Sequence, residues 1–180
     1  MKSYLPLLAA ALLLAPAHDL AAQDRHGSRV EITDGSHGRM GPRRALADAD
    51  FAITTTNQKA SLMLVDGMVA MQLTDRTLRE ITRDMDRDAR EDADDGFLAR
   101  TIANAVRNSV GSMLRRSFQY PVADIESVEY RRGRLVFTTE DGDEIFRNVE
   151  VDDDELMETF SPADAQAFVR EFRALKARTR

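Results

Sequence analysis

Two groups of charged side chains have residue types and spacings that suit ligand binding, and the first is an acidic stretch at residues 84–95. Its aspartates fall at positions 1, 3, 5, 9 and 12 of a calcium-binding loop of the EF-hand type. They are Asp84, Asp86, Asp88, Asp92 and Asp95. Calcium needs several oxygen ligands, and one loop with this spacing can supply them. A calcium site between two helices is therefore one interpretation of this stretch.

The same stretch departs from the calcium pattern at three positions. Ala89 stands where the loop needs glycine, Glu91 where an apolar residue pairs two loops, and Asp95 where a longer glutamate binds with both oxygens. Arginines also alternate with the acids at helical spacing, which allows the charges to pair along one helix. These are Arg83, Arg87 and Arg90. The sequence therefore favours a solvated helix here, with calcium binding as an alternative.

The second group consists of five arginines near a predicted hairpin turn and a predicted helix end. Arg131, Arg132 and Arg134 surround the turn, and Arg115 and Arg116 end the helix. If these two places meet, the guanidiniums form an anion site for a phosphate, a lipid head group or an acidic partner. The favoured interpretation is simpler, because charges at a hairpin edge also prevent strands of different molecules from pairing.

Side chains typical of catalysis are scarce in this chain. It has no cysteine, and its histidines are His18, His26 and His37, all before residue 50. The rest of the sequence thus lacks the commonest general base, the commonest metal ligand and the thiol nucleophile. It also has no P-loop, nucleophile elbow or dinucleotide-binding glycine pattern. We expect a non-enzymatic protein without a cofactor, and a hydrolase that uses only carboxylates is an alternative.

The first 22 residues have the layout of a secretory signal peptide. Lys2 precedes an apolar run from Leu5 to Ala17, and small residues up to Ala22 offer a cleavage site. Cleavage after Ala17 is an alternative. The apolar run, about 13 residues long, is shorter than the ~20 residues that cross a bilayer, which makes an uncleaved anchor less favoured. Without cysteine there is no lipid anchor and no disulfide. We expect a soluble, secreted or periplasmic protein.

The composition of the chain limits the classes of binding partner and the number of domains that we expect. The net charge of −6 argues against nucleic acid as the main partner, because phosphate binding needs clustered positive charge. We expect an unknown protein or another component of the cell envelope, with a weak anionic ligand as an alternative. Residues 23–49 are polar and predict a flexible linker. Residues 50–180 then form one domain.

In the first half of this domain, the sequence predicts strands followed by helices. Residues 51–56 alternate and include β-branched side chains, and residues 61–65 and 68–73 are also strand-like. Asp66-Gly67 between the last two is a hairpin turn sequence, so residues 51–73 are predicted to form a β-meander. Thr74 caps a helix with an apolar stripe at Leu78, Ile81 and Met85. A long central helix follows at about residues 96–118.

In the second half, the sequence predicts a second group of strands followed by a C-terminal helix. Three strands over about residues 124–151 form a second β-meander, with Arg132-Gly133 and Asp141-Gly142 as turns. An acidic cluster at residues 152–155 predicts a turn or a helix start. Ser161 caps a C-terminal helix at about residues 162–177, whose apolar residues share one face.

Grouped strands and separate helices predict an α+β fold. The expected architecture is an antiparallel sheet, built from the two β-meanders and covered by the long central helix and the C-terminal helix. Residues 124–177 resemble the end of a PH-like barrel, in which a final helix closes one opening. The helices predicted at residues 74–118 stand where such a barrel has further strands. The resemblance is one of topology, and it implies a fold comparison without a function.

Overall fold

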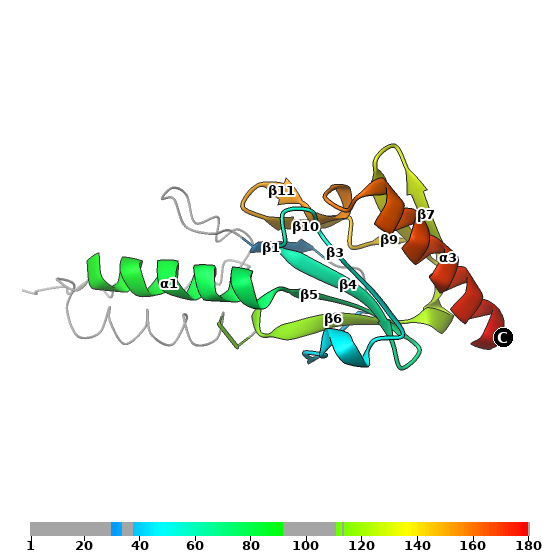
Figure 1. Cartoon of the computed structure of the whole chain (residues 1–180), viewed down its shortest axis with the longest axis horizontal. Coiled ribbons are helices and arrows are strands. Elements are labelled where there is room, and N and C mark those ends of the chain that lie inside the picture. The colour runs from blue at the N-terminus through cyan, green and yellow to red at the C-terminus, as the bar shows by residue number, and fades with distance from the viewer. Residues whose placement is uncertain (1–29, 34–37, 92–110, 113, 180) are drawn as a thin grey trace, which may run out of the picture.

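The structure is a computed structural model in which residues 30–33, 38–91, 111–112 and 114–179 are described. Its largest element is a five-stranded antiparallel sheet with the order β2-β6-β5-β4-β3 (Figure 1). These strands are β2 (Arg39–Pro42), β3 (Phe51–Thr54), β4 (Ala60–Val65), β5 (Met68–Leu73) and β6 (Arg116–Pro121).

Two smaller three-stranded sheets, the helices α1 and α3, the helical residues 111, 112 and 114, and three short 3-10 turns complete the described fold. One small sheet has the order β7-β8-β9 and the other β1-β10-β11. Their strands are β1 (Val30–Thr33), β7 (Ile125–Arg131), β8 (Arg134–Thr139), β9 (Glu144–Ile145), β10 (Asn148–Val151) and β11 (Asp154–Glu155). The helices are α1 (Asp75–Glu91) and α3 (Pro162–Thr179), and the 3-10 turns are η1 (Leu46–Asp48), η3 (Val122–Asp124) and η4 (Leu156–Glu158). The predicted α+β class is confirmed.

Local sequence signals account for the hairpins and for the starts of the two helices. Asp66 and Gly67 both have positive φ, 51° and 70°, as a two-residue hairpin turn with the twist of its strands requires. Thr74 Oγ1 accepts a hydrogen bond from the backbone N–H of Thr77 at 3.3 Å, and thereby caps α1. Ser161 Oγ accepts one from the N–H of Asp164 at 3.1 Å and caps α3.

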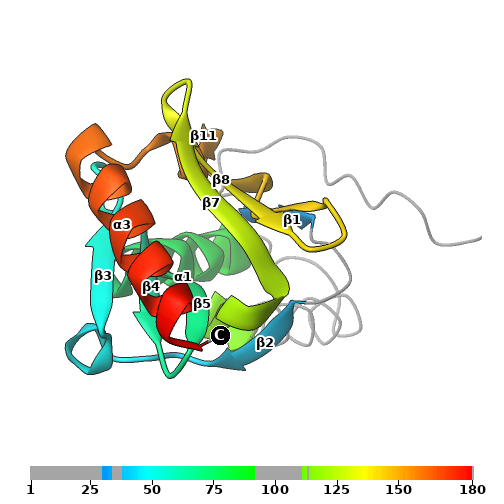
Figure 2. The same cartoon turned by 90° about the vertical axis from the view of Figure 1, so that its right-hand side faces the viewer.

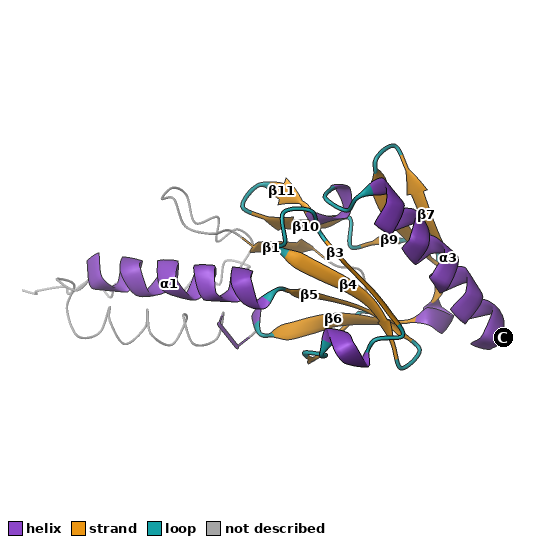
Figure 3. Ribbon diagram, viewed as in Figure 1, coloured by secondary structure: helices purple, strands orange, loops and turns teal. Residues whose placement is uncertain are grey.

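The main core lies between one face of the large sheet and α3. Figures 2 and 3 show α3 against the sheet at the end opposite to α1. Phe168 of α3 is fully buried, and its ring lies 6.2 Å from that of Phe51 on β3 and 6.0 Å from that of Phe137 on β8. This aromatic contact joins the large sheet to the β7-β8-β9 sheet.

The predicted central helix needs a correction at its C-terminal end. Residues 92–110 lie outside the described part of the chain, while residues 116–118 belong to β6 and not to a helix. β6 pairs with β2 on one side and β5 on the other. Tyr120 has no exposed surface, and Ser117 and Gln119 are buried with it. Pairing on both edges and burial of Tyr120 favour the strand over continuation of the helix.

The predicted third strand of the second meander is divided between two sheets. β9 pairs with β8, whereas β10 pairs with β1 and β11. Between them Phe146 adopts a positive φ of 60° and turns its ring into the core, 5.1 Å from Tyr120 and 5.3 Å from Phe137. Burial of this aromatic ring compensates for an unfavourable backbone conformation.

The predicted linker at residues 23–49 also needs a correction. Residues 30–33 form β1, and residues 39–42 form β2 at the edge of the large sheet. The following segment is fixed to β5, because Gln72 exchanges two hydrogen bonds of 2.9 Å with the backbone of Arg44. Ala49 packs against a small cluster of Met63, Val65 and Ala70 on the second face of the sheet. The folded unit therefore begins before Asp50.

The resemblance to a PH-like barrel does not extend to a closed barrel in the described residues, whose strands form three separate sheets. α3 packs against β3 and β7, which lie in different sheets. Within the described ranges, neither helix combines the length and the hydropathy needed to cross a membrane.

Candidate functional site

A cleft of about 490 Å³ lies where α1 leaves the large sheet. Four arginines from three chain segments line it, and they are Arg43, Arg79, Arg83 and Arg115. Asp75, Leu78 and Thr82 complete the lining. We call this cleft with its four arginines the arginine cleft.

Strand register brings the first two arginines together. Pro42 opposes Arg116 in the last pair of β2 and β6. Arg43 follows Pro42 and Arg115 precedes Arg116, so both arginines adjoin this last pair at the same end of the β2–β6 ladder, and both line the cleft.

The helix supplies the other two arginines. Arg79 and Arg83 are four residues apart on α1, so they share one face and follow each other by about 6 Å along the axis. α1 begins directly after β5, which is the neighbour of β6 in the sheet. The cleft is thus built at the ends of three adjacent strands.

Only Arg43 is neutralised within the described residues. Its Nη1 donates to the carbonyl oxygen of Leu73 and its Nη2 to Asp75 Oδ1, both at 2.7 Å. Asp75 is the only acidic residue in the lining. Arg79, Arg83 and Arg115 are exposed and have no ion pair with another residue of the described ranges. Three clustered cations without a counter-charge from the described residues attract an anion.

The five arginines of the sequence prediction are not brought together. Arg115 lines the cleft, and Arg116 is exposed at the start of β6. Arg131, Arg132 and Arg134 surround the β7–β8 turn, and Figure 1 shows this turn in a different part of the molecule. Arg134 pairs with Glu144 of β9 at 2.9 Å, which crosslinks the small sheet. Arg115 therefore lies with Arg43, Arg79 and Arg83 in the cleft, and not with the arginines of the β7–β8 turn.

The predicted calcium loop is helical over its first eight positions. Asp84, Asp86 and Asp88 lie on α1, which continues to Glu91. Residues two positions apart lie on opposite sides of a helix, so the carboxylates of Asp84 and Asp86 do not face one ion. Asp84 Oδ1 instead accepts a hydrogen bond from Arg87 at 2.6 Å. Asp92 and Asp95 lie outside the described residues, as do all three histidines. In the described ranges no three acidic, histidine or cysteine side chains are placed to hold a metal.

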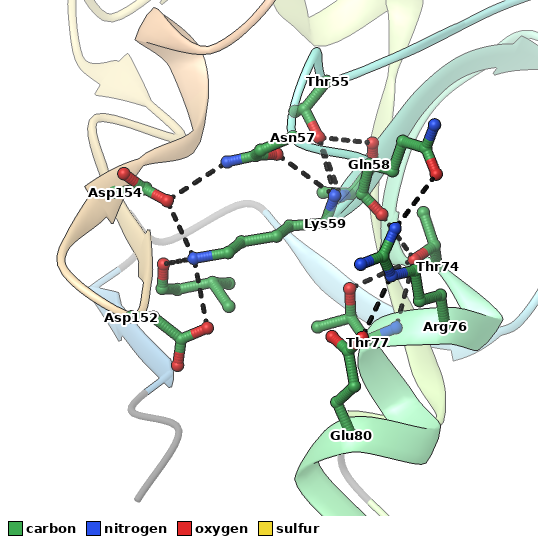
Figure 4. A network of polar contacts seen from close by, with 12 residues as sticks. Thr55, Asn57, Gln58, Lys59, Thr74, Arg76, Thr77, Glu80, Asp152 and Asp154 are labelled. Atoms are coloured by element: carbon green, nitrogen blue, oxygen red, sulfur yellow. Dashed lines mark hydrogen bonds and ion pairs between the residues drawn. The ribbon is translucent and has the colours of Figure 1, made fainter. Parts of the chain in front are cut away.

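A second polar cluster connects the loop between β3 and β4 to the turn between β10 and β11 (Figure 4). Lys59 Nζ donates to the carbonyl oxygen of Val151 at 3.0 Å and to Asp154 Oδ2 at 2.7 Å, and lies 3.1 Å from Asp152 Oδ2. Asn57 Nδ2 donates to the same oxygen of Asp154 at 3.2 Å. All three ammonium protons thus have partners inside the fold.

These contacts change the acidity of both ionic partners. Burial by itself lowers the pKa of Lys59, but hydrogen bonds and charges from Asp154 and Asp152 outweigh it, so the pKa rises above 10.5. The hydrogen bond from Lys59 is the main cause that lowers the pKa of Asp154 below 3.8. Both groups stay charged over the ordinary pH range. The cluster therefore stabilises the fold, and its donors and acceptors are already occupied.

Sequence reasoning missed three of the four arginines of the cleft. Arg43 lies in the segment that the composition predicts to be a linker, and the spacing of charges predicts pairing of Arg83 with neighbouring acids. One local signal was present, because Arg79 and Arg83 are like charges four residues apart, an arrangement that destabilises a helix without an external anion. The register of β2 and β6, which adds Arg43 and Arg115, has no comparable signal in the sequence.

Comparison of the chain with protein-family models, curated proteins and solved structures gave no match.

Proposed function

We propose that this chain is an exported binding protein that holds an anionic ligand in the arginine cleft. The observation that carries the proposal is the convergence of four guanidiniums, three of which have no counter-charge in the described residues. Guanidinium groups bind carboxylates and phosphates through paired N–H donors. Even Arg43 has about three of its five N–H donors left for a ligand.

The chemistry of the lining supports binding more than catalysis. Arginine stays protonated at all physiological pH values, so it neither takes up nor releases protons during a reaction. The single carboxylate, Asp75, is held by Arg43 at 2.7 Å. Leu78 and Thr82 add an apolar contact and a hydroxyl. This set of side chains is therefore suited to the electrostatic recognition of an anion.

Titration calorimetry with inorganic phosphate and with citrate at low salt tests the anion site. We expect the double change Arg79→Ala and Arg83→Ala to weaken binding at least about tenfold, because each charge-assisted hydrogen bond contributes about 1.5–3 kcal/mol before screening. Added salt is expected to weaken binding by the unchanged protein as well.

Arg76→Ala is the matched control for this titration. Arg76 lies on the same exposed helix, but it pairs with Glu80 at 2.9 Å and is not part of the lining. Its removal is expected to leave anion binding unchanged. Equal losses in the control and in the double variant, or no binding of either anion by the unchanged protein, contradict the proposal.

Export is the second part of the proposal, and it is based on the sequence of residues 1–22. We expect a secretion-competent bacterial host to release a product that begins at Gln23, or at His18 if the alternative site is used. Intact-mass measurement of the extracytoplasmic protein checks this. Leu13→Arg places a charge in the apolar run and is expected to keep the uncleaved chain in the cytoplasm. Cytoplasmic retention of the unchanged chain contradicts export.

A further inference from the structure

Three of the four arginines of the cleft form a row along α1, and they are Arg43, Arg79 and Arg83. Arg43 contacts Asp75 in the first turn of the helix. Arg79 follows one turn later and Arg83 two turns later, at steps of about 6 Å along the axis. Positive charge therefore extends over about 12 Å, which is longer than a single phosphate or carboxylate group. A ligand that engages the whole row carries more than one anionic group.

The described residues leave the arginine cleft open along its length. Arg79, Thr82, Arg83 and Arg115 are all exposed, and Leu78 is half-buried. Sites for small molecules normally enclose most of the ligand surface. In this cleft a small molecule keeps much of its surface in water. An extended chain that lies along α1 and continues beyond both ends needs no enclosure.

The spacing of the arginines on α1 matches that of alternate residues in an extended peptide. Side chains at positions i and i+2 of a strand point to the same side and lie about 6.6 Å apart. The step from Arg79 to Arg83 is about 6 Å. Arg43 already holds a carboxylate, that of Asp75, through one of its terminal nitrogens.

From this match we infer that the cleft binds an extended acidic segment of a partner protein, with carboxylates at alternate positions facing Arg79 and Arg83. The inference rests on the proposed function, since it names the ligand of the same site. Leu78, half-buried in the lining, contacts the aliphatic parts of the bound segment.

Charge favours an acidic peptide over a polymer of phosphates. A phosphate polymer carries a charge on every unit, so some of its charges come near Asp75 in the lining. The whole chain has a net charge of −6, which repels a dense polyanion at long range. A segment with acidic and neutral residues in alternation carries about half that charge density and places its carboxylates opposite the arginines.

Fluorescence anisotropy on the full-length mature protein tests the inference with two synthetic peptides of equal composition. One alternates glutamate and serine over eight residues, and the other repeats two glutamates followed by two serines, so that no two of its glutamates are two positions apart. We expect the alternating peptide to bind at least about fivefold more tightly, because it places carboxylates opposite both helical arginines. Arg83→Glu is expected to weaken this binding at least about tenfold, whereas Arg76→Glu leaves it unchanged. Circular dichroism confirms that both exposed substitutions leave the fold intact.

A short inorganic polyphosphate and single phosphate ions complete the experiment and separate the two proposals. If both peptides bind equally, or if polyphosphate binds more tightly than either, the inferred ligand class is wrong. The anion site still holds in that case, provided that binding depends on Arg79 and Arg83. If neither peptide, polyphosphate nor phosphate binds, the proposed function fails together with the inference.

Discussion

Among single residues, Lys59 joins two turns that are more than ninety positions apart in the sequence. Its side chain is 19% exposed, and its loss leaves the Val151 carbonyl and Asp154 without their cation. We expect Lys59→Met to lower the free energy of unfolding by about 1–2 kcal/mol, measured by urea denaturation. Arg147→Met serves as the control, because Arg147 is exposed and makes no ion pair with the described residues.

The pH dependence of this stabilisation follows from the two pKa shifts. The pKa of Asp154 is lower in the folded state, so its contribution is complete above about 3.8 and is lost as the pH falls through the folded value. The pKa of Lys59 is higher in the folded state, so its contribution is lost only as the pH rises above 10.5. Unfolding measured between about pH 2 and 6 is expected to show a weaker acid dependence in Lys59→Met. An identical dependence in both proteins contradicts this account.

Among the elements, β2 depends on the absence of a side chain at Gly41. A Cβ at this position overlaps the side-chain amide of Gln119, which is buried and donates to the Pro42 carbonyl at 3.1 Å and to Ser117 Oγ at 2.7 Å. We expect Gly41→Ala to lower the free energy of unfolding by about 1–3 kcal/mol, since β2 or Gln119 has to move.

Gly111→Ala is the control for the effect of adding a methyl group. No atom lies within 4 Å of a Cβ placed there, so the substitution is expected to be neutral or slightly stabilising in a helical position. Because Arg43 follows β2 directly, Gly41→Ala is also expected to weaken phosphate binding in the arginine cleft. Unchanged stability in Gly41→Ala contradicts the packing described for β2.

In the whole molecule, residues before Asp50 cover an edge and a face of the large sheet. β2 pairs along β6, and Ala49 packs against the cluster of Met63, Val65 and Ala70. A chain that begins at Asp50 leaves the β6 edge and this apolar cluster open to water. We expect it to aggregate or to lose cooperative unfolding, as checked by light scattering and thermal denaturation, while a chain that begins at Gln23 stays monodisperse. Equal behaviour of the two chains contradicts a structural role for β2.

The sequence by itself determined the features that depend on a few neighbouring residues. The turn at Asp66-Gly67 needs two residues that tolerate positive φ, and the caps at Thr74 and Ser161 need an oxygen within reach of nearby N–H groups. Composition and strand grouping also predicted the α+β class. Each of these signals acts over one turn or one period, so it is visible without knowledge of the fold.

Only the tertiary structure determined that residues 39–42 and 116–121 form strands and that the arginine cleft exists. A short polar segment such as residues 39–42 becomes a strand when it finds a partner edge, and β6 is a strand because β2 and β5 flank it. That pairing brings Arg43 and Arg115, which are far apart in the sequence, to the same end of the sheet, where both line the cleft with residues of α1. Spacing along the chain cannot reveal such a site, because the contacts that build it are long-range.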